Sequence, residues 1–174
     1  MTHAAPLILT LALDERSFAF FDEQRQRYFP PARNFIPAHL TLFHHLPGAH
    51  VESIQRYIEE RCSELPPFPA EVTGLRSLGR GVAYTLQSEK LRGLRESFVQ
   101  EWAQWLTPQD RQKHQPHVTV QNNVEPQKAR ELLTELTESF QPFQAQATGL
   151  DLWWYRGGPW EKVRGFPFAR TGWS

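Results

Sequence analysis

The sequence has one cysteine, no long apolar run and no excess of either charge. Cys62, the one cysteine, cannot form an intramolecular disulfide or a cysteine-rich zinc site. The longest apolar run, Leu7 to Leu13, is far shorter than the roughly 20 residues that a membrane-spanning helix needs. It also has no basic leader and no small-residue cleavage site. We therefore expect a cytoplasmic protein without a membrane segment or a signal peptide.

The charge of the chain is balanced, with 19 lysines and arginines against 19 aspartates and glutamates. Proteins that bind long nucleic acids neutralise many phosphates with basic side chains, so this balance argues against such a surface. It is compatible with a small phosphate-bearing substrate or with the end of an RNA. The length of 174 residues, of which 40% are hydrophobic, predicts one domain or two small lobes that share a core. We expect a monomer.

Hydrophobic periodicity and the positions of proline and glycine predict alternating strands and helices. Strands are expected at Leu7–Leu13, Asn34–Leu46 and His114–Asn123. Helices are expected at Ser17–Tyr28, His50–Leu65, Ser88–Trp105 and Pro126–Phe140. Two hairpins are expected, one from Pro67–Leu78 and Gly81–Gln87 around Gly79-Arg80-Gly81, and one from Phe143–Tyr155 and Trp160–Phe168 around Arg156-Gly157-Gly158.

This order of elements repeats within the chain. Strand, helix, strand, helix and hairpin occur once over about residues 7–87 and again over about residues 81–170, with the middle strand shared. The segments 67–75 and 142–150 have six identities in nine positions, as Pro-Phe-x-Ala-x-x-Thr-Gly-Leu. Similarity at a fixed offset is typical of an internal repeat, although two edge strands entered through Pro-Phe would also resemble each other. We therefore predict a single two-lobed domain over residues 1–174 that arose by internal duplication.

Each half of the predicted duplication carries one His-x-Thr motif. The first is His39-Leu40-Thr41-Leu42 and the second is His117-Val118-Thr119-Val120. Side chains alternate between the two faces of a strand, so the histidine and threonine of each motif share one face while the apolar residues point into the core. A single motif of this kind occurs easily by chance. Two copies at matching places in a repeat do not, and they indicate a paired functional site.

The paired motifs resemble the 2H phosphoesterase superfamily, and its 2′-5′ RNA ligase-like and cyclic nucleotide phosphodiesterase branches are the most similar. The resemblance covers nearly the whole chain. It implies an α+β fold with two pseudo-symmetric lobes, whose antiparallel sheets face a central cleft and whose helices lie outside. It also implies a metal-independent phosphodiesterase without a cofactor. Its substrates would be 2′,3′-cyclic phosphates or 2′-5′ linked RNA and nucleotides, with 2′-5′ RNA ligation as the reverse reaction.

The chemistry of a cyclic phosphate explains these residue types. Opening the ring requires a base for the attacking water and an acid for the departing ribose oxygen, and histidine serves both roles near neutral pH. Threonine hydroxyls can donate hydrogen bonds to the phosphate oxygens, where charge accumulates. The resemblance assigns catalysis to His39, Thr41, His117 and Thr119. Which histidine acts as the base stays open.

Further residues are candidates for substrate binding, with weaker support. They are Phe43 and Gln121, which continue the faces of the two motifs, Arg33 before the first motif, Arg80 and Arg156 at the hairpin tips, and Tyr155. A core aromatic is the alternative for Phe43, and a solvated loop charge is the alternative for each arginine. In the branch with ligase activity, a basic residue follows the second motif, whereas this chain has Asn122 at that place. This departure weakens the expectation of ligation more than that of phosphodiester cleavage.

Two other interpretations remain. The same cleft can belong to a non-catalytic module that binds nucleotides or RNA ends, although binding alone does not require two titratable histidines. A metal site built from His114 and His117 with His44, His45 or His50 is disfavoured. Residues three apart on a strand point to opposite faces, and no carboxylate cluster accompanies them.

Overall fold

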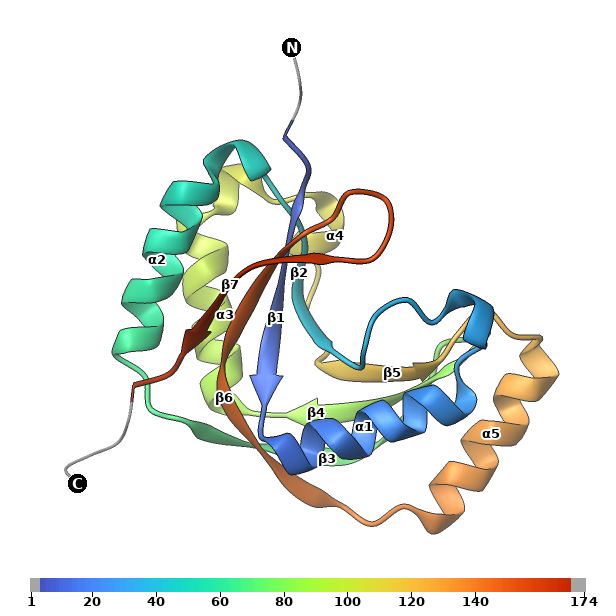
Figure 1. Cartoon of the computed structure of the whole chain (residues 1–174). Helices are drawn as coiled ribbons and strands as arrows, with labels where there is room; N and C mark the ends of the chain where they lie inside the picture. The colour runs from blue at the N-terminus through green and yellow to red at the C-terminus, as the bar shows by residue number, and fades with distance from the viewer. Residues whose placement is uncertain (1–3, 170–174) are drawn as a thin grey trace.

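Residues 4–169 are described by a computed structural model of the chain, which contains an antiparallel sheet with flanking helices (Figure 1). The strands are β1 (Leu7–Leu13), β2 (Leu40–Leu46), β3 (Phe68–Ser77), β4 (Val82–Gln87), β5 (His117–Gln121), β6 (Phe143–Trp154) and β7 (Glu161–Pro167). The α-helices are α1 (Glu15–Tyr28), α2 (Val51–Ser63), α3 (Glu89–Glu101), α4 (Pro108–Arg111) and α5 (Pro126–Ser139). Short 3₁₀ turns occur at Pro31–Arg33, Gly48–His50 and Ala103–Trp105.

Side chains in the sequence set the beginnings of the main helices. The carboxylate of Asp14 accepts from the backbone N–H of Ser17 at the start of α1. The Ser88 hydroxyl does the same for Leu91 at the start of α3, and Pro126 occupies the first turn of α5, where no N–H is needed. Asp14 also accepts from the backbone N–H of Gln146 in β6, which fixes the start of α1 against the sheet.

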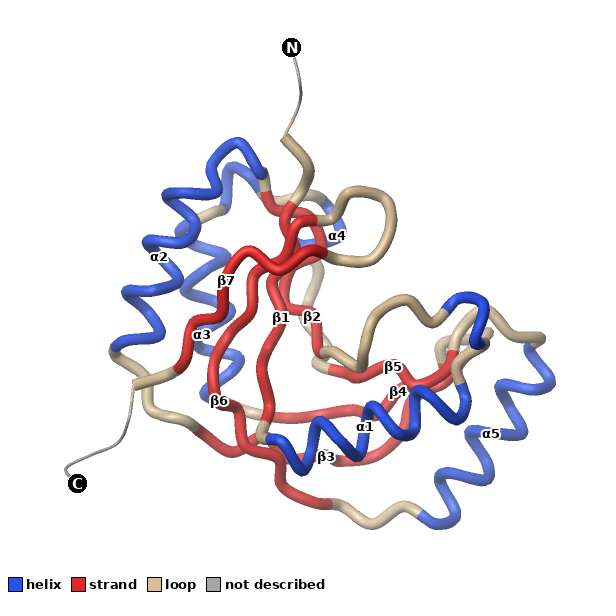
Figure 2. Tube along the Cα trace, in the orientation of Figure 1, coloured by secondary structure: helices blue, strands red, loops and turns tan. Residues whose placement is uncertain are grey.

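The strands form one continuous sheet in the order β2-β1-β6-β3-β4-β5, with β7 paired to β6. In Figure 2 the strands β1, β2, β6 and β7 stand together, with α2 beside them, whereas β3, β4 and β5 run across the lower part beside α1 and α5. Contacts of α1 with β5, of α5 with β3 and of α2 with β7 agree with this arrangement. The predicted α+β class with antiparallel strands and flanking helices is confirmed. The two expected sheets are continuous with each other because β3 pairs with β6.

The strand pairing is symmetric about the junction of β3 and β6. Ala70 pairs with Ala145, and these alanines occupy the same position in the repeated nine-residue segment. Outward from this pair, β6 corresponds to β3, β1 to β4 and β2 to β5, so the order of the six strands reads the same from either side. This symmetry supports the proposed duplication, which remains a proposal about the origin of the chain.

The first motif strand is shorter than the sequence indicates. A strand was expected from Asn34, but β2 begins at Leu40. Pro37 has no N–H for a strand ladder, and the N–H of Ala38 donates instead to the Asp22 carboxylate on α1, at 2.9 Å. The segment before the first motif is therefore a loop that is tied to α1.

Other element boundaries differ for similar reasons. The strand expected over His114–Asn123 is reduced to β5, since Pro116 precedes it and Asn123 adopts a left-handed φ of 63° just after it. The helix expected to reach Trp105 ends at Glu101. No helix within residues 4–169 is long and apolar enough to cross a membrane.

Candidate active site

The two His-x-Thr motifs lie on strands that contact each other. His39 immediately precedes β2, and His117 is the first residue of β5. The two strands are in contact, although they are at opposite ends of the sheet order. In each motif the apolar positions are buried and the histidine and threonine are partly exposed, as the alternation predicts; the buried residues are Leu40, Leu42, Val118 and Val120.

Both motif histidines are oriented by the same type of hydrogen bond. The Nδ1 atom of His39 lies 2.9 Å from the carbonyl oxygen of Pro37. The Nδ1 atom of His117 lies 2.8 Å from the carbonyl oxygen of Gln115, also two residues earlier in the chain. A carbonyl oxygen only accepts, so Nδ1 carries the proton in both rings. In the neutral rings Nε2 is therefore the atom with the lone pair, in the same tautomer at both motifs.

The surroundings keep both histidines neutral in the free protein at pH 7. Burial lowers the pKa of His39 to about 4, and the positive charge of Arg25 acts in the same direction, as do the neighbouring His117 and His44 rings when they carry a proton. Burial also lowers the pKa of His117, with contributions from Arg76 and His44. The hydrogen bonds to the Pro37 and Gln115 carbonyls raise these pKa values but do not outweigh burial. Because His117 contributes to the pKa of His39, the two rings are close enough to interact electrostatically.

Each motif strand contains a bulge directly after the threonine. Thr41 pairs with Thr10, but Phe43 pairs with Leu9, so β2 has one extra residue in this interval. In the same way, Thr119 pairs with Ala83 but Gln121 pairs with Val82, so β5 also has one extra residue at this point. A bulge ends the simple alternation of side chains, because two residues on one strand oppose a single residue on the other.

The bulges correct the prediction that Phe43 and Gln121 continue the exposed faces of the motifs. Phe43 has no exposed surface and packs against Phe98 and Trp102. Gln121 is 2% exposed, and its Oε1 atom has no hydrogen-bond partner within the described residues. The side chain that follows each bulge therefore points into the protein interior, and neither residue belongs to the accessible site.

Two buried arginines hold the motif strands from opposite helices. Arg25 on α1 donates from Nη1 to the carbonyl oxygen of Thr119, at 3.1 Å. Arg95 on α3 donates from Nε to the carbonyl oxygen of Leu42, at 3.0 Å. Arg25 thus comes from the first half of the chain and binds the bulge in the second half. Arg95 comes from the second half and binds the bulge in the first. The sequence offered no signal for these contacts, which depend on how the two halves pack.

A buried aspartate fixes the rest of β2. The carboxylate of Asp110 accepts from the backbone N–H groups of His44 and His45, at 2.8 and 2.9 Å. It also lies 3.3 Å from Nδ1 of His44. Nearby, Nε2 of His114 lies 2.9 Å from the carbonyl oxygen of Thr41, which joins the segment before the second motif to the first motif. Residues 4–169 contain no group of three or more His, Cys, Asp or Glu side chains that could hold a metal ion.

A cavity of about 330 Å³ opens beside His39. Its walls are mostly apolar and include Phe18, Phe35, Trp153 and Trp160. The ring of Trp160 lies 4.6 Å from the imidazole of His39, between ring centroids. Trp160 follows the glycine-rich tip of the β6–β7 hairpin, so its position beside the motif depends on tertiary folding, and no local pattern in the sequence distinguishes it.

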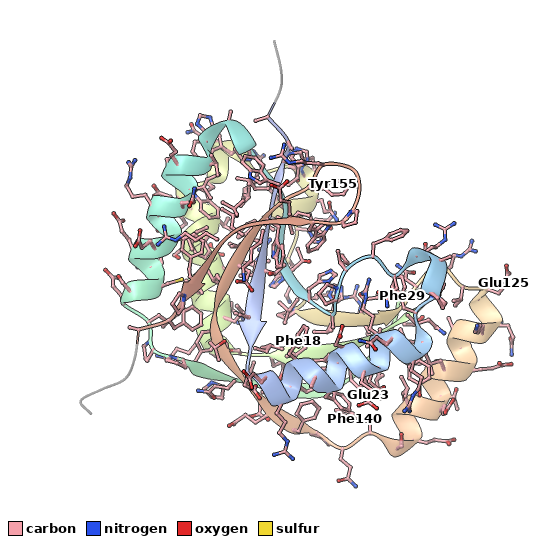
Figure 3. All side chains as sticks on the ribbon, in the orientation of Figure 1. Phe18, Glu23, Phe29, Glu125, Phe140 and Tyr155 are labelled. Carbon is pink, nitrogen blue, oxygen red and sulfur yellow. The ribbon has the colours of Figure 1, made fainter. Side chains whose placement is uncertain are left out.

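The other predicted binding residues lie in loops. Arg33 is exposed in a 3₁₀ turn, and Arg80 donates from Nε to the Val124 carbonyl oxygen, which pins the loop after β5. Arg156 is 3.0 Å from Glu161 in an exposed ion pair. Tyr155, 43% exposed, lies at the start of the β6–β7 loop (Figure 3). None of these four side chains lines the cavity beside His39.

The fold is similar to that of solved bacterial structures. The crystal structure of TT0787 of Thermus thermophilus matches with a TM-score of 0.67 at 15% identity, over 96% of this chain and 100% of that chain. E. coli LigT complexed with 3′-AMP matches with a TM-score of 0.59 at 19% identity, over 96% and 99% of the two chains. E. coli LigT complexed with phosphate matches with a TM-score of 0.58 at 19% identity, over 97% and 100%.

Sequence comparison identifies the family. No curated protein sequence matches the chain. The family model of the 2′-5′ RNA ligase superfamily matches residues 13–159, which include both motifs and most of the sheet. The predicted resemblance to the 2H phosphoesterases is thereby confirmed. The chain belongs to the 2′-5′ RNA ligase superfamily.

Proposed function

We propose that the protein is a metal-independent phosphodiesterase that acts on 2′,3′-cyclic phosphates or 2′-5′ linked RNA and nucleotides. Membership in the 2′-5′ RNA ligase superfamily supports phosphoesterase activity in general. His39, Thr41, His117 and Thr119 are the proposed catalytic residues. The observation that carries the proposal is the matched pair of Nδ1 hydrogen bonds, which leave Nε2 of both histidines available for proton transfer.

In the proposed hydrolysis, one neutral imidazole accepts a proton at Nε2 from the attacking water. The water oxygen forms a new bond to phosphorus, and the bond from phosphorus to one ribose oxygen breaks. The second histidine, protonated at Nε2, donates its proton to that oxygen. The products are a phosphate monoester and a ribose hydroxyl. Ligation would use a ribose 5′-hydroxyl in place of water: its oxygen bonds to phosphorus, the bond from phosphorus to one ring oxygen breaks, and the same two histidines take up and supply the protons.

Substrate binding favours the protonated state that the acid requires. Burial and nearby positive charges lower the pKa of both histidines in the free protein. An anionic phosphate next to the imidazoles has the opposite effect, because a nearby negative charge favours the imidazolium form. The acid is thus charged mainly when the substrate is in place.

The remaining groups suit a nucleotide. The hydroxyls of Thr41 and Thr119 lie on the same faces as the histidines and are suited to donate to the non-bridging phosphate oxygens. The aromatic cavity beside His39 is large enough for a nucleobase, and its tryptophans offer stacking surfaces. E. coli LigT, which shares the fold, has been crystallised with 3′-AMP and with phosphate, which is consistent with this use of the site.

A substrate panel tests the proposal. Wild type and His117→Ala would be assayed in a chelator against 2′,3′-cyclic mononucleotides, RNA with a cyclic-phosphate end and 2′-5′ linked dinucleotides. We expect wild-type turnover of at least one member and a loss of about 10²–10⁴-fold in the variant. His50→Ala, which removes an exposed histidine stacked on Trp105, is the control and should keep full activity. Binding without turnover of any member by folded wild type would favour the non-catalytic binding module instead.

A further inference from the structure

An arginine outside the motifs lies in line with the second motif threonine. Arg76 in β3 pairs with Ala83 in β4, and Ala83 pairs with Thr119 in β5. Directly paired residues in adjacent strands project from the same face of a sheet, so Arg76 and Thr119 share one face. The side chain between them, that of Ala83, is a methyl group, which is too small to separate two longer side chains on either side of it.

Arg76 has no partner for its charge within residues 4–169. Its guanidinium takes part in none of the ion pairs or side-chain hydrogen bonds of this part of the chain, although its side chain is partly buried. Its charge contributes to lowering the pKa of His117, which indicates that the guanidinium lies near that ring. A partly buried cation without a counter-ion is costly unless a ligand supplies the negative charge.

The equivalent position beside the first motif is different. Asp151 pairs with Thr10, which pairs with Thr41, so Asp151 has the same relation to the first motif that Arg76 has to the second. Asp151 forms an ion pair with Lys162 of β7, at 3.2 Å. Within residues 4–169 no strand corresponding to β7 lies beside the end of β3 that holds Arg76, since β3 pairs with β6 only as far as Val72. The charge at this position is therefore neutralised beside the first motif and uncompensated beside the second.

The segment after the second motif supplies no positive charge of its own. Gln121, Asn122 and Asn123 follow Val120, and Gln121 is buried. Any cation that binds phosphate at the His117 end must come from another element. Arg76 meets this need from the middle of the sheet.

We propose that Arg76 is a further catalytic residue that binds the non-bridging oxygens of the scissile phosphoryl group beside His117 and Thr119. This proposal rests on the proposed function and deepens it. Arginine is suited to the role because its planar guanidinium donates two parallel hydrogen bonds to a phosphoryl group. Arg76 would bind the phosphate at the His117 end, with the nucleoside toward the aromatic cavity beside His39.

The experiment compares Arg76→Gln and Arg76→Lys with Arg56→Gln. Arg56 is exposed on α2, and its replacement makes the same change in net charge away from the site. With the best substrate of the panel, Arg76→Gln is expected to lower kcat/KM by about 10²–10³-fold. Arg76→Lys should recover part of this loss, and Arg56→Gln should have no effect. Thermal unfolding of each variant checks that it is folded.

A second measurement separates substrate contact from a structural role. The groups whose charges lower the pKa of His117 are Arg76 and His44, so Arg76→Gln should move the optimum of kcat/KM to higher pH. Arg56→Gln should leave the optimum in place. Equal activity and equal pH profiles for Arg76→Gln and wild type would overturn the proposal.

The proposal remains testable if wild type turns over no member of the panel. In that case the proposed hydrolysis fails, and inorganic phosphate serves as the probe in calorimetric titrations. Phosphate binding that is about tenfold weaker in Arg76→Gln than in wild type and Arg56→Gln would still support a phosphate contact at Arg76. Equal affinities, or no phosphate binding by wild type, would overturn it.

Discussion

At the scale of single residues, the proposed mechanism depends on two imidazoles in the same tautomer. The backbone carbonyls of Pro37 and Gln115 accept from Nδ1, so each ring keeps Nε2 for the proposed proton transfer without a carboxylate partner. Carbonyl oxygens orient a ring but carry no negative charge. They therefore cannot offset burial and the surrounding cations, and the pKa of both histidines lies below 6.5.

The pH dependence follows from these values. Two-histidine catalysis requires one neutral and one protonated ring, so kcat/KM is greatest between the two pKa values of the free enzyme. These are about 4 for His39 and a value below 6.5 for His117. Activity falls at lower pH as the base is protonated and at higher pH as the acid loses its proton. We expect kcat/KM for a 2′,3′-cyclic nucleotide to peak below about pH 6.5.

Initial rates at low substrate concentration from about pH 3.5 to about pH 9 measure this profile on both sides of its optimum. The profile of kcat should lie at higher pH than that of kcat/KM, because bound phosphate raises the pKa of both imidazoles. An optimum of kcat/KM above about pH 7 would contradict the electrostatic description of the free site.

The motif residues could be identified from the sequence, but their neighbours could not. His39, Thr41, His117 and Thr119 stand out because a local pattern occurs twice at matching places. Arg76 and Trp160 are single residues whose relation to the motifs arises from strand pairing and from the fold of a hairpin. Such relations connect positions that are far apart in the chain and leave no local pattern.

At the scale of elements, the bulges in β2 and β5 determine which side chains face the site. Period-two alternation holds for His39 to Leu42 and for His117 to Val120, and it fails at the next residue of each strand. The bulge in β2 is stabilised by contacts from distant segments, through Arg95 and Asp110. Alternation alone therefore placed Phe43 on the wrong face, because nothing near it in the sequence indicates the extra residue.

Asp110→Asn tests the support of β2. Burial raises the pKa of Asp110, but the hydrogen bonds from His44 and His45 outweigh burial and hold it below 3.8. The amide retains one acceptor oxygen and turns an NH₂ group toward the second backbone donor. We expect the free energy of unfolding at pH 7 to fall by about 1–3 kcal/mol, measured by urea titration. Glu23→Gln, which alters an exposed carboxylate on α1, should change it little.

The same variant has an expected pH signature. The pKa of Asp110 is lower in the folded protein than in the unfolded chain, so its contribution is complete above about pH 4 and is lost as the pH falls through the folded pKa. Wild type should therefore lose stability more steeply than Asp110→Asn below about pH 4. Parallel acid unfolding curves for the two proteins would contradict this role of the carboxylate.

At the scale of the whole molecule, two halves with corresponding strands each contribute one motif to the site. The symmetric order of strands about Ala70 and Ala145 brings β2 and β5 into contact, and Arg25 and Arg95 cross from each half to the motif strand of the other. The symmetry is not complete. The aromatic cavity and β7 lie on the side of the first motif, whereas Arg76, which has no ion-pair partner among the described residues, lies on the side of the second.

The order of elements and the repeat could be predicted from the sequence, since they follow from periodicity and from identities between two segments. The continuity of the sheet could not. It depends on pairing of β3 with β6, whose residues are 75 positions apart in the central pair, Ala70 and Ala145. Helices of one half also contact strands of the other, as α1 contacts β5, and no local pattern in the sequence predicts these contacts.

The central claim is that His39 and His117 act together on one phosphate, and a double-mutant cycle tests it most directly. The kcat/KM of wild type, His39→Ala, His117→Ala and the double variant would be measured in a chelator with the best substrate of the panel. Residues that act as a unit give strongly non-additive losses. The account predicts that each single variant loses about 10²–10⁴-fold and that the double variant is scarcely worse than either. Losses that multiply in the double variant, or full activity in either single variant, would contradict it.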